Sequence, residues 1–177
     1  MEESVESRVD LQSEDDRTDV QKAGAKEEKA PDLAAYIEQA LGVEKADIRT
    51  YSPLALAYIG DAVYDLWIRT YLVADGKNDP DRLHKKATRY VSAVAQSAII
   101  KAMSDDLSEE EQRIVKRGRN AKPHSTAKNA SVADYLNATG FECLIGYLYL
   151  KGETDRISML IKKGIELTDN TENTDEK

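Results

Sequence analysis

The length and composition of the chain predict one domain with its own hydrophobic core. Its 177 residues are 41% hydrophobic and 33% charged, which is enough for one core and too little for two separate domains. The single cysteine, Cys143, excludes an intrachain disulfide and a cysteine-rich zinc site. Because no apolar run is long enough to span a bilayer, we expect a cytoplasmic protein that makes no membrane contact.

Acidic residues are concentrated at the two ends of the chain. The formal net charge is -8, but residues 1–30 hold 10 acidic and 5 basic side chains, and residues 165–177 hold 5 and 1. Residues 82–128 carry 11 basic and 5 acidic side chains, together with both histidines. A basic region therefore lies inside an acidic protein, and the net charge alone does not exclude nucleic acid as a partner.

The first 30 residues have few apolar side chains, so we predict a disordered acidic tail at 1–30. Residues 31–50 are predicted as a short helix and a linker, with Asp32 as the helix N-cap and Gly42 as its end. The main domain is predicted at 51–167. The last ten residues, 168–177, resemble the first segment in composition and are predicted as a second disordered acidic tail.

The main domain is predicted to be an all-α helical bundle, because its apolar residues recur at helical spacing and no segment alternates like a strand. Ser108 and Glu111 form a capping-box pattern, and Gly118 is expected to end that helix. The first helix is apolar nearly all round, which predicts burial on every side. Helices are expected at 53–73, at 81–103 with a break at 90–92, at 108–118, at 131–150 and from Thr154 onward, with a polar, basic loop at 119–130.

Two acidic side chains lie in the two most hydrophobic predicted helices. An ionised carboxylate in apolar surroundings must be paired, protonated or bound to a metal ion, so Asp61 and Glu142 need an explanation. Gly60 precedes Asp61, and Gly140 and Gly146 flank Glu142, so the two helices can approach closely at these glycines. Carboxylates that converge there would suit Mg²⁺, which could activate water for phosphodiester cleavage.

The same two acids could instead form structural salt bridges, and the spacing alone favours that interpretation. The available basic partners are Arg69, Lys85 and Arg89. Asp65 lies one helical turn after Asp61 and can form an ion pair with a basic side chain or line a contact between subunits.

Four segments resemble the ribonuclease III family. Residues 54–69 read LALAYIGDAVYDLWIR and resemble the family's hallmark helix, and residues 140–152 read GFECLIGYLYLKG and resemble its second acidic helix. Residues 83–96, LHKKATRYVSAVAQ, and 109–122, EEEQRIVKRGRNAK, are similar to the Mini-ribonuclease III branch specifically. The resemblance extends over residues 52–165.

This resemblance implies an all-α endonuclease domain that acts as a homodimer and cuts both strands of an RNA duplex with Mg²⁺. By position in the motifs, Asp61 corresponds to the catalytic, metal-binding aspartate and Glu142 to the second metal-binding acid. The resemblance also implies that the substrate is the stem of the 23S ribosomal RNA precursor, whose 5′ and 3′ ends are matured. A large-subunit ribosomal protein is a further expected partner.

The sequence departs from full-length ribonuclease III at two acid positions. Ala57 replaces a glutamate four residues before Asp61, and Thr139 replaces an aspartate three residues before Glu142. Both departures fit the resemblance to the Mini branch, which implies an active site with fewer acidic residues. Residues 153–177 are too few to fold as a separate double-stranded RNA-binding domain, so we expect the catalytic domain to hold its own substrate.

The basic region is the expected RNA-binding surface, through contacts to phosphates and 2′-hydroxyls. For any single lysine an ordinary solvated charge is the favoured interpretation, whereas for residues 117–128 as a group RNA binding is favoured. Two alternatives to an enzyme remain: a non-catalytic duplex-RNA-binding ribosome-assembly factor and a helical protein-interaction domain with an acidic tail. The residues expected to bind RNA are His84, Lys85, Lys86, Arg89, Arg117, Arg119, Asn120, Lys122 and Lys128.

Overall fold

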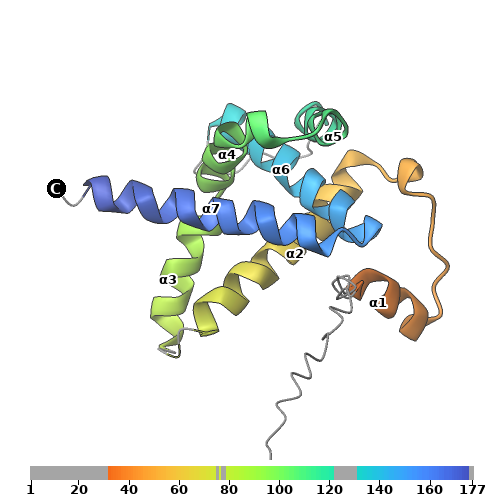
Figure 1. The fold of residues 1–177 in the computed structure, drawn as a ribbon, viewed down its shortest axis with the longest axis horizontal. Helices are drawn as coiled ribbons and strands as arrows, with labels where there is room; N and C mark the ends of the chain where they lie inside the picture. Colours follow the sequence, from red (N-terminus) through yellow and green to blue (C-terminus); the bar gives the residue numbers. More distant parts are fainter. Residues whose placement is uncertain (1–31, 75, 77–78, 122–130, 176–177) are drawn as a thin grey trace, which may run out of the picture.

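A computed structural model describes residues 32–74, 76, 79–121 and 131–175. These residues form α-helices and two short 3-10 helices, with no strand among them, so the all-α prediction is confirmed (Figure 1). The predicted tail at 1–30 lies outside the described residues. The helices are α1 (Leu33–Leu41), α2 (Pro53–Ala74), α3 (Pro80–Val91), α4 (Ala93–Ala102), α5 (Glu109–Arg119), α6 (Val132–Lys151) and α7 (Thr154–Asp175), with 3-10 turns at Ile48–Thr50 and Ser104–Asp106.

Local capping chemistry explains most of the helix starts. The side chains of Asp32, Ser92, Ser108 and Ser131 each accept a hydrogen bond from the backbone N–H three residues later, and such caps contribute about 1 kcal/mol each. The capping box of α5 is complete, because the Ser108 backbone N–H donates to Glu111 Oε2 at 2.8 Å. The predicted break at 90–92 is the junction of α3 and α4, where Ser92 caps α4.

Helix α6 is the centre of the molecule. It packs against α2, α4 and α5 and also contacts α1 and α7, and Figure 1 shows it behind α7, between α2 and α5. Its core side chains include Phe141, whose ring meets the ring of Tyr64 edge to face at a centroid distance of 5.0 Å. No helix in the described part of the chain has the length and apolar character needed to cross a membrane.

Gly118 does not end α5 as predicted. The helix continues to Arg119 and is capped by Asn120, and a Cβ at Gly118 would lie 2.7 Å from Cys143 Cβ. The glycine is therefore needed for close approach of α5 to α6 and not for a left-handed turn.

The prediction of a disordered tail from residue 168 is wrong as far as Asp175, because α7 continues to that residue. Tyr90 on α3 donates from its hydroxyl to Asp169 Oδ1 at 2.6 Å, and Thr168 Oγ1 donates to the Gly164 carbonyl at 2.9 Å. A contact from a distant helix thus holds Asp169, which lies near the start of a segment whose composition is that of a solvated tail.

Candidate active site

A close crossing of α2 and α6 brings Asp61 and Glu142 together. A Cβ at Gly60 would overlap the carbonyl oxygen of Glu142, and a Cβ at Gly146 would overlap the carbonyl oxygen of Leu56. Only glycine at both positions allows the two backbones to touch. Asp61 follows Gly60 directly, and its carboxylate is close enough to Glu142 for its negative charge to raise the pKa of that group.

Gly140 serves a different crossing from the one predicted for it. A Cβ at Gly140 would lie 3.0 Å from the Val115 carbonyl oxygen and 2.8 Å from Arg119 Cγ, both on α5. Gly118 of α5 faces Gly140, because a Cβ at Gly118 would lie 2.9 Å from the Gly140 Cα. The backbone of α6 is therefore in close contact with α2 on one side and with α5 on the other.

The environment of the two carboxylates disfavours their charged forms. Burial, and then the negative charge of Asp61, raise the pKa of Glu142 to about 8. Partial burial of the carboxyl group, and then the charge of Asp65, raise the pKa of Asp61, although Asp61 as a whole residue is solvent-exposed. Such shifts are typical of carboxylates that serve a functional site.

Neither Asp61 nor Glu142 forms an ion pair with another described residue. Arg69, one of the possible partners, pairs instead with Asp65, with Arg69 Nε 2.5 Å from Asp65 Oδ2. Two neighbouring carboxylates of like charge without a described basic partner suit a divalent cation, which would relieve their repulsion.

The two departures from the family pattern leave the site with few acids. Ala57 and Thr139 are both buried, and the Thr139 hydroxyl donates to the Tyr135 carbonyl at 3.0 Å. No cluster of three or more Asp, Glu, His or Cys side chains that could hold a metal ion occurs among the described residues. Water and substrate oxygens would therefore have to complete the shell of any cation held by Asp61 and Glu142.

Gln96 on α4 is a polar residue of this site that sequence reasoning missed. Its side-chain amide lies beside Glu142 and lowers the pKa of that carboxyl group, against the larger effect of burial. Gln96 is 1% exposed. A glutamine in a predicted helix is ordinarily a surface residue, so no signal in the sequence singles it out.

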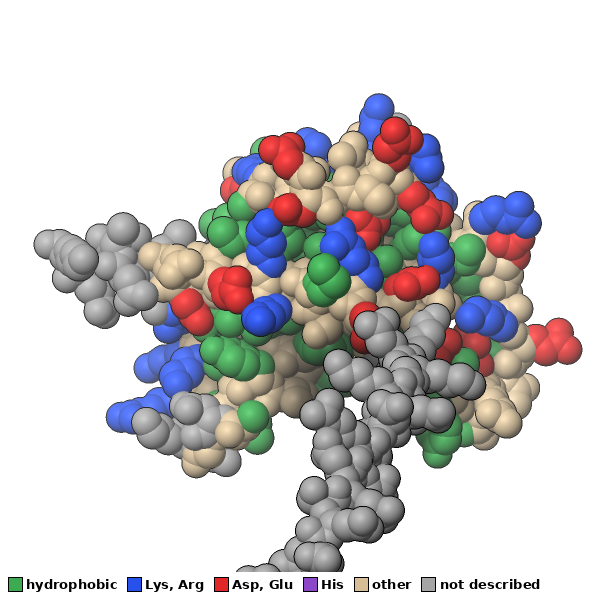
Figure 2. Space-filling view, in the orientation of Figure 1, with side chains coloured by type: hydrophobic (Ala, Val, Ile, Leu, Met, Phe, Trp, Pro, Cys, Tyr) green, Lys and Arg blue, Asp and Glu red, His purple; other side chains and the backbone are tan. Residues whose placement is uncertain are grey.

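The residues expected to bind RNA fall into two groups on separate helices. His84, Lys85 and Lys86 are exposed on α3, where Figure 2 shows basic side chains gathered on the surface. Arg89 on the same helix is half-buried, with its guanidinium carbon 5.9 Å from the centre of the Tyr90 ring.

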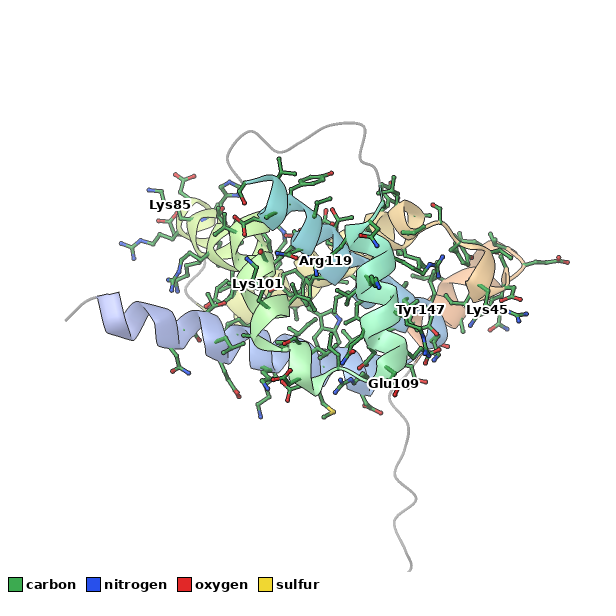
Figure 3. All side chains as sticks on the ribbon, turned by 90° about the horizontal axis from the view of Figure 1, so that it is seen from above. Lys45, Lys85, Lys101, Glu109, Arg119 and Tyr147 are labelled. Carbon is green, nitrogen blue, oxygen red and sulfur yellow. The ribbon has the colours of Figure 1, made fainter. Side chains whose placement is uncertain are left out.

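The second group lies at the C-terminal end of α5, where Arg117, Arg119 and Asn120 are exposed. Figure 3 shows Lys85 of the first group and Arg119 of the second at well separated points, with Lys101 of α4 between them in that view. Lys122 and Lys128, the other two predicted contacts, lie outside the described residues.

Comparisons with known proteins identify the family of the chain. Residues 54–153 match the family model described as Ribonuclease III domain. Mini-ribonuclease 3 of Clostridium tetani is 49% identical over 124 residues, covering 70% of this chain and 82% of that protein. Mini-ribonuclease 3 of Enterococcus faecalis is 51% identical over 117 residues, covering 65% and 89%.

The fold has a solved counterpart as well. A crystal structure of a protein from Fusobacterium nucleatum superposes with a TM-score of 0.63 at 37% identity, covering 68% of this chain and 96% of that one. The residues matched by the family model include both Asp61 and Glu142. The chain therefore belongs to the Mini-ribonuclease III branch of the ribonuclease III family and is an endoribonuclease.

Proposed function

We propose that this protein is an Mg²⁺-dependent endoribonuclease that cleaves double-stranded RNA as a homodimer. Its proposed task is to mature the 5′ and 3′ ends of the 23S ribosomal RNA precursor in the cytoplasm. The observation that carries the proposal is the pairing of Asp61 with Glu142 at the α2–α6 crossing, without a basic partner among the described residues. Membership of a family that acts on double-stranded RNA with divalent metal ions supports it.

In this proposal Asp61 and Glu142 hold the cation through their carboxylate oxygens. Once bound, the cation would activate water and stabilise negative charge on the scissile phosphate. Both carboxylates must be ionised to bind it, so Glu142, with its raised pKa, loses its proton as the cation enters. The α2–α6 crossing keeps the two backbones that carry these side chains at a constant separation, because neither can move without opening the glycine contact.

The test is cleavage of a long RNA duplex and of a 23S precursor stem, with Mg²⁺ and with chelator. We expect wild type to cut only with Mg²⁺ and Asp61→Asn to lose more than the roughly 100-fold that removal of an outer-shell partner can cost. Asp65→Asn is the matched control, because Asp65 lies one turn away and is paired with Arg69. Duplex binding without cleavage under every condition would instead favour the ribosome-assembly factor.

The homodimer part of the proposal rests on the exposed face of α2, a helix predicted to be buried on all sides. Tyr58 is 84% exposed and Leu66 is 54% exposed, and their spacing of eight residues places them on one face. A second copy of the chain would cover these side chains. Sedimentation equilibrium should give a dimer for wild type and a monomer for Tyr58→Glu, and a monomeric wild type would refute this part.

A large-subunit ribosomal protein is proposed as the partner that presents the 23S precursor stem. If so, ribosomal proteins bound to the precursor should accelerate cleavage of that stem and leave cleavage of an unrelated duplex unchanged. Equal acceleration of cleavage for both substrates would contradict the proposal, because a protein that presents the 23S precursor stem should affect only the substrate that contains this stem.

A further inference from the structure

Gln96 is a buried amide without a hydrogen-bond partner among the described residues. Neither its Nε2 nor its Oε1 meets another described polar atom at hydrogen-bond geometry, although its amide lies close enough to Glu142 to lower the pKa of that group. A buried polar group left without a partner destabilises the fold, because it has given up its hydrogen bonds to water. A residue with that cost at the edge of an active site calls for a functional explanation.

The four other polar residues that are buried as whole residues in the described part of the chain have hydrogen-bond partners. Asn137 Nδ2 donates to Ser97 Oγ at 3.1 Å, and Ser97 Oγ donates to Asp134 Oδ1 at 2.8 Å. Glu111 accepts from Arg156 Nε at 2.7 Å, and the hydroxyl of Thr139 is bonded as described above. Gln96 differs from these residues because its amide has no such partner and acts on the Glu142 carboxyl group.

Helix α4 holds Gln96 in place through the residue that follows it. Ser97 joins α4 to the first half of α6 through Asp134 and Asn137, and Lys101 of α4 also pairs with Asp134, Nζ to Oδ1 at 3.3 Å. These bonds fix the register of α4 against α6. Gln96 is thereby held against Glu142 from a third helix, separate from the helix that carries Asp61.

We propose that Gln96 is a positioning residue of the active site, whose amide Nε2 donates to the ionised Glu142 carboxylate and orients its other oxygen toward a divalent cation shared with Asp61. This inference rests on the proposed function of the Asp61–Glu142 pair. A carboxylate has four lone-pair positions and can accept from the amide while it binds a cation. Partners of this kind keep metal ligands oriented. Gln96 would supply such a partner in a site where Ala57 and Thr139 stand in place of two further acids.

The test compares Gln96→Met with Gln112→Met in the full chain. The chemical change is the same in both, but Gln112 lies on α5, where its Nε2 donates to the Leu107 carbonyl at 3.1 Å. Binding of Mn²⁺ and of Mg²⁺ is measured by titration calorimetry without RNA, and the melting temperature is measured in chelator.

We expect Gln96→Met to weaken cation binding by about 10- to 100-fold and to leave the melting temperature in chelator unchanged or higher, since a buried unpartnered amide is removed. Gln112→Met should bind the cations like wild type. Unchanged cation affinity in Gln96→Met, or a lower melting temperature as its only effect, would overturn the inference. A wild type that binds neither cation would instead refute the proposed metal site itself.

Discussion

At the scale of single residues, the site is an unequal pair of carboxylates. Asp61 belongs to a solvent-exposed position on α2, whereas Glu142 is half-buried on α6. Burial and the neighbouring Asp61 raise the pKa of Glu142 to about 8, so at neutral pH without a cation Glu142 keeps its proton. The proton and the cation therefore compete for Glu142.

The raised pKa of Glu142 predicts how the free energy of unfolding depends on pH in chelator. The folded chain keeps the Glu142 proton up to about pH 8, and the unfolded chain releases it near the ordinary glutamate value of 4.5. Because the folded state binds more protons in this interval, its free energy of unfolding should fall as pH rises from 5 to 8, by at most about 1.4 kcal/mol per unit. Urea unfolding at pH 5, 6, 7 and 8 measures that slope.

The control for the pH prediction separates Glu142 from glutamates in general. Glu142→Gln should flatten the slope. Glu110→Gln should leave it unchanged, because hydrogen bonds from Tyr147 and Lys151 lower the pKa of Glu110 and it is ionised throughout this interval. Equal slopes for wild type and Glu142→Gln would show that the proton is not on Glu142.

At the scale of elements, α6 organises the molecule through two glycine crossings. Gly60 and Gly146 bring α2 against it, and Gly118 and Gly140 bring α5 against it. The acid-bearing helices are thus joined by backbone contact, which fixes the distance between the two backbones that carry the carboxylates. The same crossings make α6 intolerant of any added atom at these positions.

Gly60→Ala should therefore destabilise the fold strongly. The new Cβ would overlap the Glu142 carbonyl oxygen, which belongs to a helix backbone and cannot rotate away. We expect a loss of about 3 kcal/mol or more in the free energy of unfolding, at the upper end of the usual cost of overpacking. Denaturant unfolding followed by circular dichroism measures it.

Gly164→Ala on α7 is the matched control for this prediction. A Cβ there would lie 3.3 Å from Ile99 Cγ2, the end of a side chain that can shift. Replacing glycine by alanine within a helix also favours the helix by up to about 1 kcal/mol. The change in stability should therefore stay within about 1 kcal/mol. A Gly60→Ala protein as stable as Gly164→Ala would contradict the close crossing.

At the scale of the whole molecule, charge is distributed unevenly. The chain is acidic overall, with a formal net charge of -8, yet α3 exposes several basic side chains and the end of α5 exposes others. Figure 2 shows mixed charges over α7, in contrast to the basic cluster at α3. We expect duplex RNA to be held by these local groups, since the net charge of the molecule would repel it.

The α3 group can be tested through the salt dependence of RNA binding. Lys85→Ala with Lys86→Ala should lower the slope of log affinity against log salt concentration by about 2, because each phosphate contact contributes about 1. Lys45→Ala with Lys162→Ala removes the same charge from exposed positions outside both basic groups and should leave the slope nearly unchanged. Equal slopes in the two double variants would show that α3 does not contact phosphates.

The sequence by itself determined the helical fold class, most helix limits and the two acids. Helix starts were predictable because a cap such as Ser108 bonds a backbone N–H only three residues away. Asp61 and Glu142 could be identified because charged residues are costly in apolar helices and because their segments resemble a known motif. The metal-binding roles of both acids stay predictions, as does the RNA contact of the basic residues.

Only the tertiary structure decided the features that depend on contacts between distant residues. The Tyr90 hydroxyl bonds to Asp169 near the start of an acidic segment that belongs to α7, and contact with α6 explains why Gly118 lies inside α5 instead of ending it. The position of Gln96 close to Glu142 is a third feature that only the tertiary structure decided. Each depends on how separate helices pack, whereas composition and spacing report only on neighbours along the chain.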